Sequence, residues 1–172
     1  MGQVKKEALL IIDVQYFYFE GGAIELVHPV EAAQNARQLL SIFRNEKKLV
    51  VHVKHQAETG DEIHSLVEPN AGEKVITKNE VNAFLNTDLL EFLQKNEIKK
   101  LVLCGMQTHM CLEAATRAAS DFGFECTVIA DACATRDLIF GNDTISAKDV
   151  HLSTLSTLKS YAKVVDLRSY LK

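Results

Sequence analysis

The chain has 172 residues, of which 47% are hydrophobic and 24% charged, with a formal net charge of −4 at pH 7. These proportions are typical of a soluble globular protein, and the length suits one domain, residues 1–172, with a sizeable core. The longest basic blocks are lysine pairs, and apolar runs reach only about five to seven residues. We therefore expect neither a nucleic-acid partner nor a membrane span.

The amino-terminal segment MGQVKKE leads directly into the apolar run ALLII, without the layout of a cleavable signal peptide. Lys6 stands where a myristoylation signal on Gly2 would need a serine or threonine. A cytoplasmic location is expected. In that reducing compartment disulfides are disfavoured.

The four cysteines fall into two pairs, and six residues separate the members of each pair. Zinc sites usually place their paired ligands two to four residues apart. The spacing therefore argues against a four-cysteine metal site. Cys104 and Cys126 are predicted to be buried strand residues, Cys133 to be structural, and Cys111 to need a separate explanation.

Strand-like and helix-like segments alternate along the whole chain. The first, ALLIIDV, is an apolar run with β-branched residues, as expected of a strand covered on both faces. The next begins at Pro29 and has apolar residues at helical spacing. The predicted strands are 8–14, 48–53, 74–78, 99–104, 125–131 and 162–167, and the predicted helices are 29–47, 87–96, 111–122 and about 146–160.

This alternation predicts an α/β fold with three layers, in which helices cover both faces of an open parallel sheet of about six strands. Such sheets bind ligands at the carboxyl ends of their strands, where the strand order reverses. The residues that directly follow the predicted strands are therefore the candidates for a site. They are Asp13 and Gln15, His55, Lys78, the heptad GMQTHMC at 105–111, and Asp131 to Arg136.

Three of these candidates have complementary chemistry. If the first and fourth strands flank the reversal point, Asp13 and Cys111 face each other across it. A carboxylate beside a thiol can accept its proton, and the ammonium group of Lys78 can offset the negative charge of both. Cys111 stands at a predicted helix start, where unpaired backbone N–H groups and the helix dipole favour a thiolate and can stabilise an oxyanion.

The motifs LLIIDVQ, KNEVNAF and LVLCGMQTHMC, at these separations, resemble those of the isochorismatase-like cysteine hydrolase superfamily. That superfamily includes nicotinamidases and N-carbamoylsarcosine amidases, and the resemblance covers almost the whole chain. It implies a Rossmann-like sheet of order 3-2-1-4-5-6 and a catalytic triad of Asp13, Lys78 and Cys111. It also implies an oxyanion hole formed by the backbone N–H groups of Gln107 and Cys111, and a cis peptide bond between Met106 and Gln107.

The function that follows is cysteine-dependent hydrolysis of a small amide, ureide or carbamoyl compound through a thioester. Isochorismatase-type cleavage of a vinyl ether is the alternative, although enzymes of that type typically lack the cysteine. A thiol-based redox or binding protein on the same fold is a second alternative. No nucleotide-binding glycine motif follows any predicted strand. The partners expected are a small-molecule substrate and, from the resemblance, further copies of the chain in a homo-oligomer of two or more.

The surroundings of the triad are predicted less directly. Related nicotinamidases bind a metal through an Asp-x-His motif, and the segment HVKHQAETGDEIH contains none. No metal or cofactor is therefore expected, with a metal at His55 and His64 as the alternative. His52 and His151 are predicted to be packing residues, and Arg136 is predicted to pair with Asp137. The residues predicted to line a substrate pocket are Gln15, Tyr18, His55, Phe84 and His109.

Overall fold

The computed structural model describes residues 6–172. The expectations that rest on the signal and lipidation motifs at Gly2 lie outside the described residues. The strands are β1 (Lys6–Ile12), β2 (Leu49–His55), β3 (Lys74–Lys78), β4 (Ile98–Met106), β5 (Glu125–Ala134), β6 (Leu138–Phe140), β7 (Asp143–Ile145) and β8 (Ala162–Val165). The helices are α1 (Pro29–Asn45), α2 (Leu89–Lys95), α3 (Glu113–Asp121), α4 (Ala147–Leu158) and α5 (Leu167–Tyr170), with short helical turns η1 (Tyr16–Tyr18), η2 (Ser65–Val67) and η3 (Thr108–Leu112).

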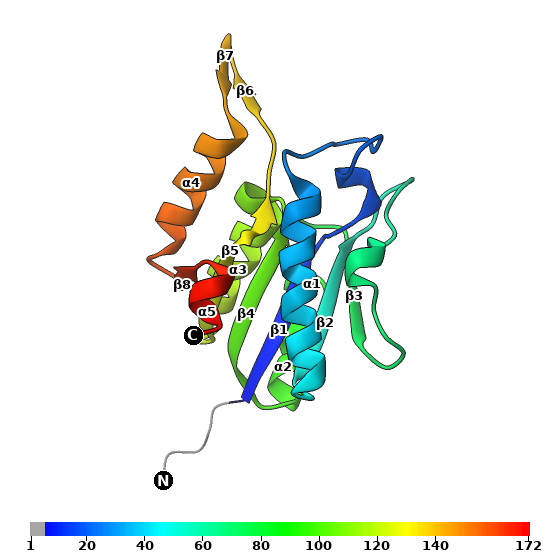
Figure 1. Cartoon of the computed structure of the whole chain (residues 1–172). Helices are drawn as coiled ribbons and strands as arrows, with labels where there is room; N and C mark the ends of the chain where they lie inside the picture. The colour runs from blue at the N-terminus through cyan, green and yellow to red at the C-terminus, as the bar shows by residue number, and fades with distance from the viewer. Residues whose placement is uncertain (1–5) are drawn as a thin grey trace.

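Six strands form one parallel sheet in the order β3-β2-β1-β4-β5-β8. This confirms the predicted order 3-2-1-4-5-6, because β8 is the sixth strand of the sheet. Helix α1 crosses one face, while α2 and α3 lie behind the sheet in the same view (Figure 1). Among the helices of residues 6–172, none combines the length and apolar character needed to cross a bilayer.

The hairpin of β6 and β7 was not predicted from the sequence. Its two three-residue strands pair antiparallel and extend beyond the sheet and its helices (Figure 1). Ile139 and Phe140 on this hairpin are 78% and 81% exposed. Only a few residues lie between Arg136 and the next helix. Their alternation of apolar and polar side chains is too short to predict a hairpin.

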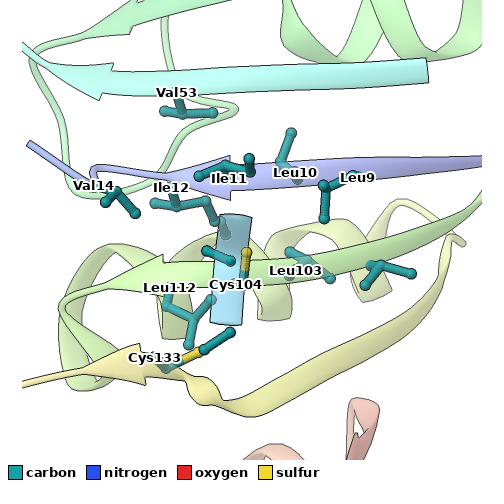
Figure 2. Packing of buried hydrophobic residues seen from close by; sticks show 14 of the residues in the cluster. Leu9, Leu10, Ile11, Ile12, Val14, Val53, Leu103, Cys104, Leu112 and Cys133 are labelled. Atoms are coloured by element: carbon teal, nitrogen blue, oxygen red, sulfur yellow. The ribbon is translucent and has the colours of Figure 1, made fainter. Parts of the chain in front are cut away.

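The core is centred on β1, which lies between β2 and β4. Every residue from Ala8 to Ile12 is at most 1% exposed. Leu9 to Ile12 lie along the strand beside Leu103 and Cys104 of β4 (Figure 2). Because helices cover both faces of the sheet, both sets of alternating side chains are apolar. The continuous apolar run in the sequence is therefore explained by burial on two sides.

Gly105 lets the ends of β1 and β4 approach each other. It pairs with Ile12 and has a φ of +127°. A Cβ atom at this position would lie 1.9 Å from the carbonyl oxygen of Ile12. Only glycine fits without moving the backbone. This close approach sets the position of the two chain segments that follow, which contain Asp13 and Cys111.

A partly buried ionic cluster ties α1 and β2 to the start of β3. Arg44 of α1 donates two hydrogen bonds of 2.8 Å to the carboxylate of Glu73. The carboxylate also accepts from the backbone N–H of Asn70 at 2.8 Å and lies 2.9 Å from Nε2 of His52. Burial alone would raise the pKa of Glu73, but these donors outweigh it and lower the pKa to about 2. His52 is fully buried, so its prediction as a packing residue is confirmed.

We expect Gly105→Ala to lower the free energy of unfolding by about 3 kcal/mol or more, because the new methyl group meets backbone atoms of β1. Gly123→Ala is the matched control, since Gly123 also has a positive φ of +86° but nothing within 4 Å of the added Cβ. The control should cost only about 1 kcal/mol. Urea unfolding of both variants measures the difference, and equal losses would refute the close-approach explanation.

Glu73 should make the fold sensitive to acid. Its pKa is lower in the folded chain than the ordinary 4.5, so its contribution is present above 4.5 and is lost as the pH falls towards 2. The loss should amount to about 3 kcal/mol, since each pKa unit is worth about 1.4 kcal/mol. We expect Glu73→Gln to flatten the fall in unfolding free energy between pH 5 and pH 2. Glu91→Gln, which changes an exposed residue of α2, should leave the fall as it is.

Candidate active site

The three predicted catalytic side chains meet at the carboxyl ends of the strands. Asp13 directly follows β1, Lys78 is the last residue of β3, and Cys111 lies in η3 just after β4. The order of the sheet reverses between β1 and β4, which is where open α/β sheets form their crevice. The long side chain of Lys78 reaches from β3 past β2 to this point.

Lys78 contacts both of the other groups. Its Nζ lies 2.8 Å from Oδ2 of Asp13 and 3.2 Å from Sγ of Cys111. Asp13 is 0%, Lys78 1% and Cys111 5% exposed. The side-chain donors beside the buried carboxylate of Asp13 are Lys78, within ion-pair distance, and the thiol of Cys111. The carboxylate therefore keeps acceptor capacity for the proton of a nearby thiol.

Burial decides the resting protonation of the thiol. Burial and, after it, the negative charge of Asp13 raise the pKa of Cys111 while Lys78 opposes both effects, and the net result is a pKa of about 12. The pKa of Asp13 is also raised by burial, against the opposing charge of Lys78. Helix-start stabilisation of a thiolate, which the sequence suggested, is therefore outweighed. The thiol rests protonated and needs a base in order to react.

The segment after β4 places Gln107 and Cys111 together. The peptide bond between Met106 and Gln107 is cis. The backbone carbonyl of Gln107 accepts from the N–H groups of Met110 and Leu112, which fixes the start of η3. Asp13 itself has a φ of +50°, a left-handed conformation that aspartate tolerates better than most residues. The loops that follow β1 and β4 thus each contain an uncommon backbone conformation.

His55 completes the polar cluster around Lys78. Its Nδ1 lies 3.0 Å from Nζ of Lys78. Burial, and then the charge of Lys78, lower the pKa of His55, so its ring is neutral and accepts this hydrogen bond. Single ligand atoms of Asp13, His55 and Cys111 lie within 4.8 Å of one another. A metal ion there would have to compete with the ammonium group of Lys78, which already contacts all three.

His64 is held outside this cluster. Its ring stacks on Phe19 with centroids 3.9 Å apart, and its Nδ1 accepts from the backbone N–H of Leu66. Within residues 6–172, the alternative metal site at His55 and His64 is therefore not assembled. The four cysteines are free and buried, as was predicted for Cys104 and Cys126. Cys133 donates to the carbonyl of Ile129 at 3.2 Å, a structural contact.

A cavity of about 540 Å³ opens beside Cys111. Among the described residues, its lining combines apolar and polar side chains, including two of the residues predicted for the pocket, Tyr18 and His55. The lining residues are Phe17, Tyr18, Ala23, Ile24, His55, Gln56, Ala57, Glu58, Thr59, Val81, Gln107, Met110, Cys111 and Arg136. A larger cavity of about 990 Å³ lies at the opposite end of the strands and contains no cysteine.

The structure places Gln15, Phe84 and His109 outside that lining, which corrects their assignment to the pocket. The amide of Gln15 bonds the backbone of His55 in both directions and thereby joins the ends of β1 and β2. Phe84 packs against the rings of Phe122 and Phe124. The ring of His109 contacts the hydroxyl of Thr135 at 2.7 Å. All three side chains are used in packing or in local hydrogen bonds.

Arg136 was among the strand-end candidates but was predicted to pair with Asp137, whereas the structure places it in the lining of the cavity. The predicted pair of Arg136 and Asp137 is not formed, because the Asp137 carboxylate accepts from the backbone N–H of Ala147 at 2.7 Å. Arg136 instead donates from Nε to Oε1 of Gln107 at 3.2 Å. The amide nitrogen of Gln107 lies 3.4 Å from the hydroxyl of Tyr18. The feature of the sequence that could have indicated a cavity position is that Arg136 lies just beyond the carboxyl end of a strand.

Comparison with known proteins places these features in one family. The isochorismatase domain model matches residues 7–166. The isochorismatase family protein YddQ of Bacillus subtilis is 42% identical over 96% of this chain and 98% of its own length. The maleamate amidohydrolase of Pseudomonas putida is 30% identical over 79% of this chain and 76% of its own.

The fold is shared with solved structures as well. The crystal structure of an isochorismatase-type protein from Oleispira antarctica superposes with a TM-score of 0.94, at 40% identity, over 99% of this chain and 98% of the other. The sequence match, the sheet order and the strand-end site agree with one another. The chain therefore belongs to the isochorismatase family of hydrolases.

Proposed function

We propose that the chain is a cysteine-dependent amidohydrolase that cleaves the C–N bond of a small amide, ureide or carbamoyl compound through a thioester. The observation that supports this most directly is the buried contact of Lys78 with both Asp13 and Cys111, beside a cavity large enough for a small molecule. The similarity to a maleamate amidohydrolase is consistent with this reaction class.

The reaction begins with a proton transfer. Asp13 accepts the proton of Cys111 as the sulfur attacks the carbonyl carbon, and an S–C bond forms. The carbonyl oxygen becomes an oxyanion, for which the backbone N–H groups of Gln107 and Cys111 are the proposed donors. Protonated Asp13 then gives its proton to the leaving nitrogen, and the C–N bond breaks to release ammonia or an amine.

The second half of the reaction regenerates the thiol. Asp13 takes a proton from a water molecule, whose oxygen attacks the thioester carbon. The C–S bond then breaks, the acid product leaves, and the proton returns to the sulfur. Lys78 keeps its positive charge throughout and compensates the negative charge, which moves between the carboxylate, the sulfur and the oxyanion. The carboxylate is required in the first half because the resting thiol is protonated, and in the second half because the attacking water must lose a proton.

Cys111→Ala should reduce amide hydrolysis at least about 10⁴-fold, since no other group can form the thioester. Cys126→Ala, which removes a buried thiol of β5, is the matched control and should retain activity. Ammonia release from a panel of amides, ureides and carbamoyl compounds measures both. Hydrolysis at the normal rate by Cys111→Ala would contradict the proposal, and cleavage of a vinyl ether by that variant would favour the alternative reaction.

Asp13→Asn should separate ionisation of the thiol from catalysis. The substitution removes the charge that raises the pKa of Cys111 and frees Lys78 to stabilise the thiolate. At pH 7 we therefore expect Cys111 to react with iodoacetamide about tenfold faster or more than in the unsubstituted chain. Amide hydrolysis should nevertheless fall about 10²–10⁴-fold, because the general base is gone. Amide hydrolysis at the normal rate in this variant would contradict the assigned role of Asp13 as base, and slower alkylation would contradict the effect of its charge on the thiol.

The activity should also be lost in acid. Asp13 must be ionised to accept the proton, and burial raises its pKa above the ordinary 3.8. The rate should therefore decline as the pH falls through this raised pKa, at a higher pH than an exposed aspartate would give. A profile of kcat/KM against pH for the unsubstituted chain measures this acid limb. A rate that stayed constant down to pH 4 would exclude Asp13 as the base.

A further inference from the structure

The segment that contains Cys111 is a short, wide helical turn. In η3 the backbone N–H of Leu112 donates to the carbonyl of Gln107, five residues earlier in the chain, at 3.3 Å. Turns of this π type are rare, and they are found mostly as single turns, frequently at functional sites. Because one such turn has few hydrogen bonds of its own, the directions of its N–H groups also depend on contacts from neighbouring elements.

The first residue of η3 is anchored by a histidine of α4. Thr108 is fully buried, and its Oγ1 lies 2.9 Å from Nδ1 of His151. Helix α4 (orange in Figure 1) packs against η3, and its own start is capped by the side chain of Ser146. Burial lowers the pKa of His151, so the ring is neutral at pH 7 and Nδ1 can accept from the hydroxyl. His151 therefore does more than fill space, the role that the sequence predicted.

The second residue of η3 has an anchor of its own. Nδ1 of His109 lies 2.7 Å from Oγ1 of Thr135, which follows β5. Thr135 is 3% exposed, and its backbone carbonyl accepts from the N–H of Val27 at 2.9 Å. Two histidine–threonine contacts thus hold η3, from α4 and from the end of β5. Loss of the α4 contact should therefore loosen the turn without releasing it.

We propose that His151 is a positioning residue that holds Thr108 and thereby aims the N–H donors of the proposed oxyanion hole. This inference rests on the proposed function and adds a residue to it. Gln107 directly precedes Thr108, so a shift of Thr108 moves the first donor with it. Donors stabilise an oxyanion best when they are aligned before the reaction, and small displacements lower the rate. Among the described residues that line the cavity beside Cys111, His151 does not occur, because it faces a separate cavity of about 380 Å³.

Two reactions of Cys111 separate the position of the donors from the position of the thiol. Amide hydrolysis forms an oxyanion, whereas alkylation by iodoacetamide forms an S–C bond and expels iodide without one. We expect His151→Ala to lower kcat for the best amide of the panel about tenfold or more, and to leave KM and the alkylation rate within about threefold. An unchanged kcat would overturn the proposal. An equal loss in both reactions would also overturn it, because the thiol itself would then be displaced.

Further variants test the hydrogen bond itself. Thr108→Val replaces the hydroxyl by a methyl group and should lower kcat as much as His151→Ala does. The double variant should lose no more than either single one, since both remove the same contact. His151→Asn can place a polar atom near the position of Nδ1 and should recover most of the lost kcat. Additive losses would overturn the proposed contact, as would a His151→Asn variant no faster than His151→Ala.

His28→Asn is the matched control. It removes an exposed imidazole that lines the same separate cavity as His151. Asparagine tolerates the left-handed φ of +54° at this position. Because His28 has no printed contact with η3 but pairs with Glu31 at 3.3 Å, the control should keep kcat. A loss in this variant equal to that in His151→Ala would overturn the specific role of the Thr108 contact.

Hydrogen exchange tests the anchor without any substrate. The N–H groups of Met110 and Leu112 donate to the carbonyl of Gln107, so exchange over residues 107–112 reports the order of η3. In His151→Ala we expect this exchange to be about tenfold faster and exchange in β1 to be unchanged. Unchanged exchange over 107–112 would overturn the anchor, and faster exchange in β1 as well would show general destabilisation and overturn the positioning role.

The two measurements also separate this inference from the proposed function. If the unsubstituted chain hydrolyses no amide of the panel while exchange over 107–112 responds to His151→Ala, the hydrolase proposal fails and the anchor of η3 stands. If the unsubstituted chain hydrolyses an amide through Cys111 while His151→Ala changes neither kcat nor exchange, the positioning role is refuted and the proposed function stands.

Discussion

The buried ammonium group of Lys78 is the interaction on which the rest of the site depends. A charged lysine that is 1% exposed is stable in a protein only beside compensating groups, and here Asp13, Cys111 and His55 surround it. Burial raises the pKa of Asp13, and the positive charge of Lys78 opposes that rise and favours the carboxylate. The same charge also limits the rise in the pKa of Cys111 that the carboxylate of Asp13 causes. The charge state of each of the three proposed catalytic side chains therefore depends on the other two.

The sheet supplies the geometry that this charge arrangement requires. Parallel strands end at one edge, and the reversal of order between β1 and β4 leaves room there for side chains instead of a crossing connection. Gly105 brings the two central strands close together, and Gln15 fixes the end of β2 to the end of β1. The residues of the site thus occupy positions that are determined by backbone contacts of the rigid core.

A cavity lined mainly by apolar side chains lies beside Cys111, and its lining also contains the charged residues Glu58 and Arg136. Arg136 reaches the cavity because Asp137 is used by the first turn of α4 and because Gln107 accepts its Nε. The neighbouring loop that follows β5 therefore affects the cavity, although it contains no proposed catalytic group.

The sequence by itself determined the fold and which residues meet in the proposed catalytic cluster. The alternation of apolar strands with amphipathic helices reflects burial on both faces of the sheet, and the strand-end positions of Asp13, Lys78 and Cys111 follow from chain order alone. Patterns of this kind extend over a few neighbouring residues, so they can be recognised in the sequence without knowledge of the tertiary structure. They also identified His52 as a packing residue, since it lies inside a strand.

Only the tertiary structure decided the surroundings of that cluster. The sequence pattern predicted Phe84, Gln15 and His109 as pocket residues. In the structure Phe84 contacts another aromatic ring, Gln15 bonds the backbone of His55, and His109 contacts the hydroxyl of Thr135. Arg136 was expected to pair with its sequence neighbour and instead contacts Gln107, 29 residues away. The protonated resting thiol likewise follows from burial, which depends on the whole packed chain. Side-chain partners and local dielectric are set by segments distant in sequence, and no local pattern encodes them.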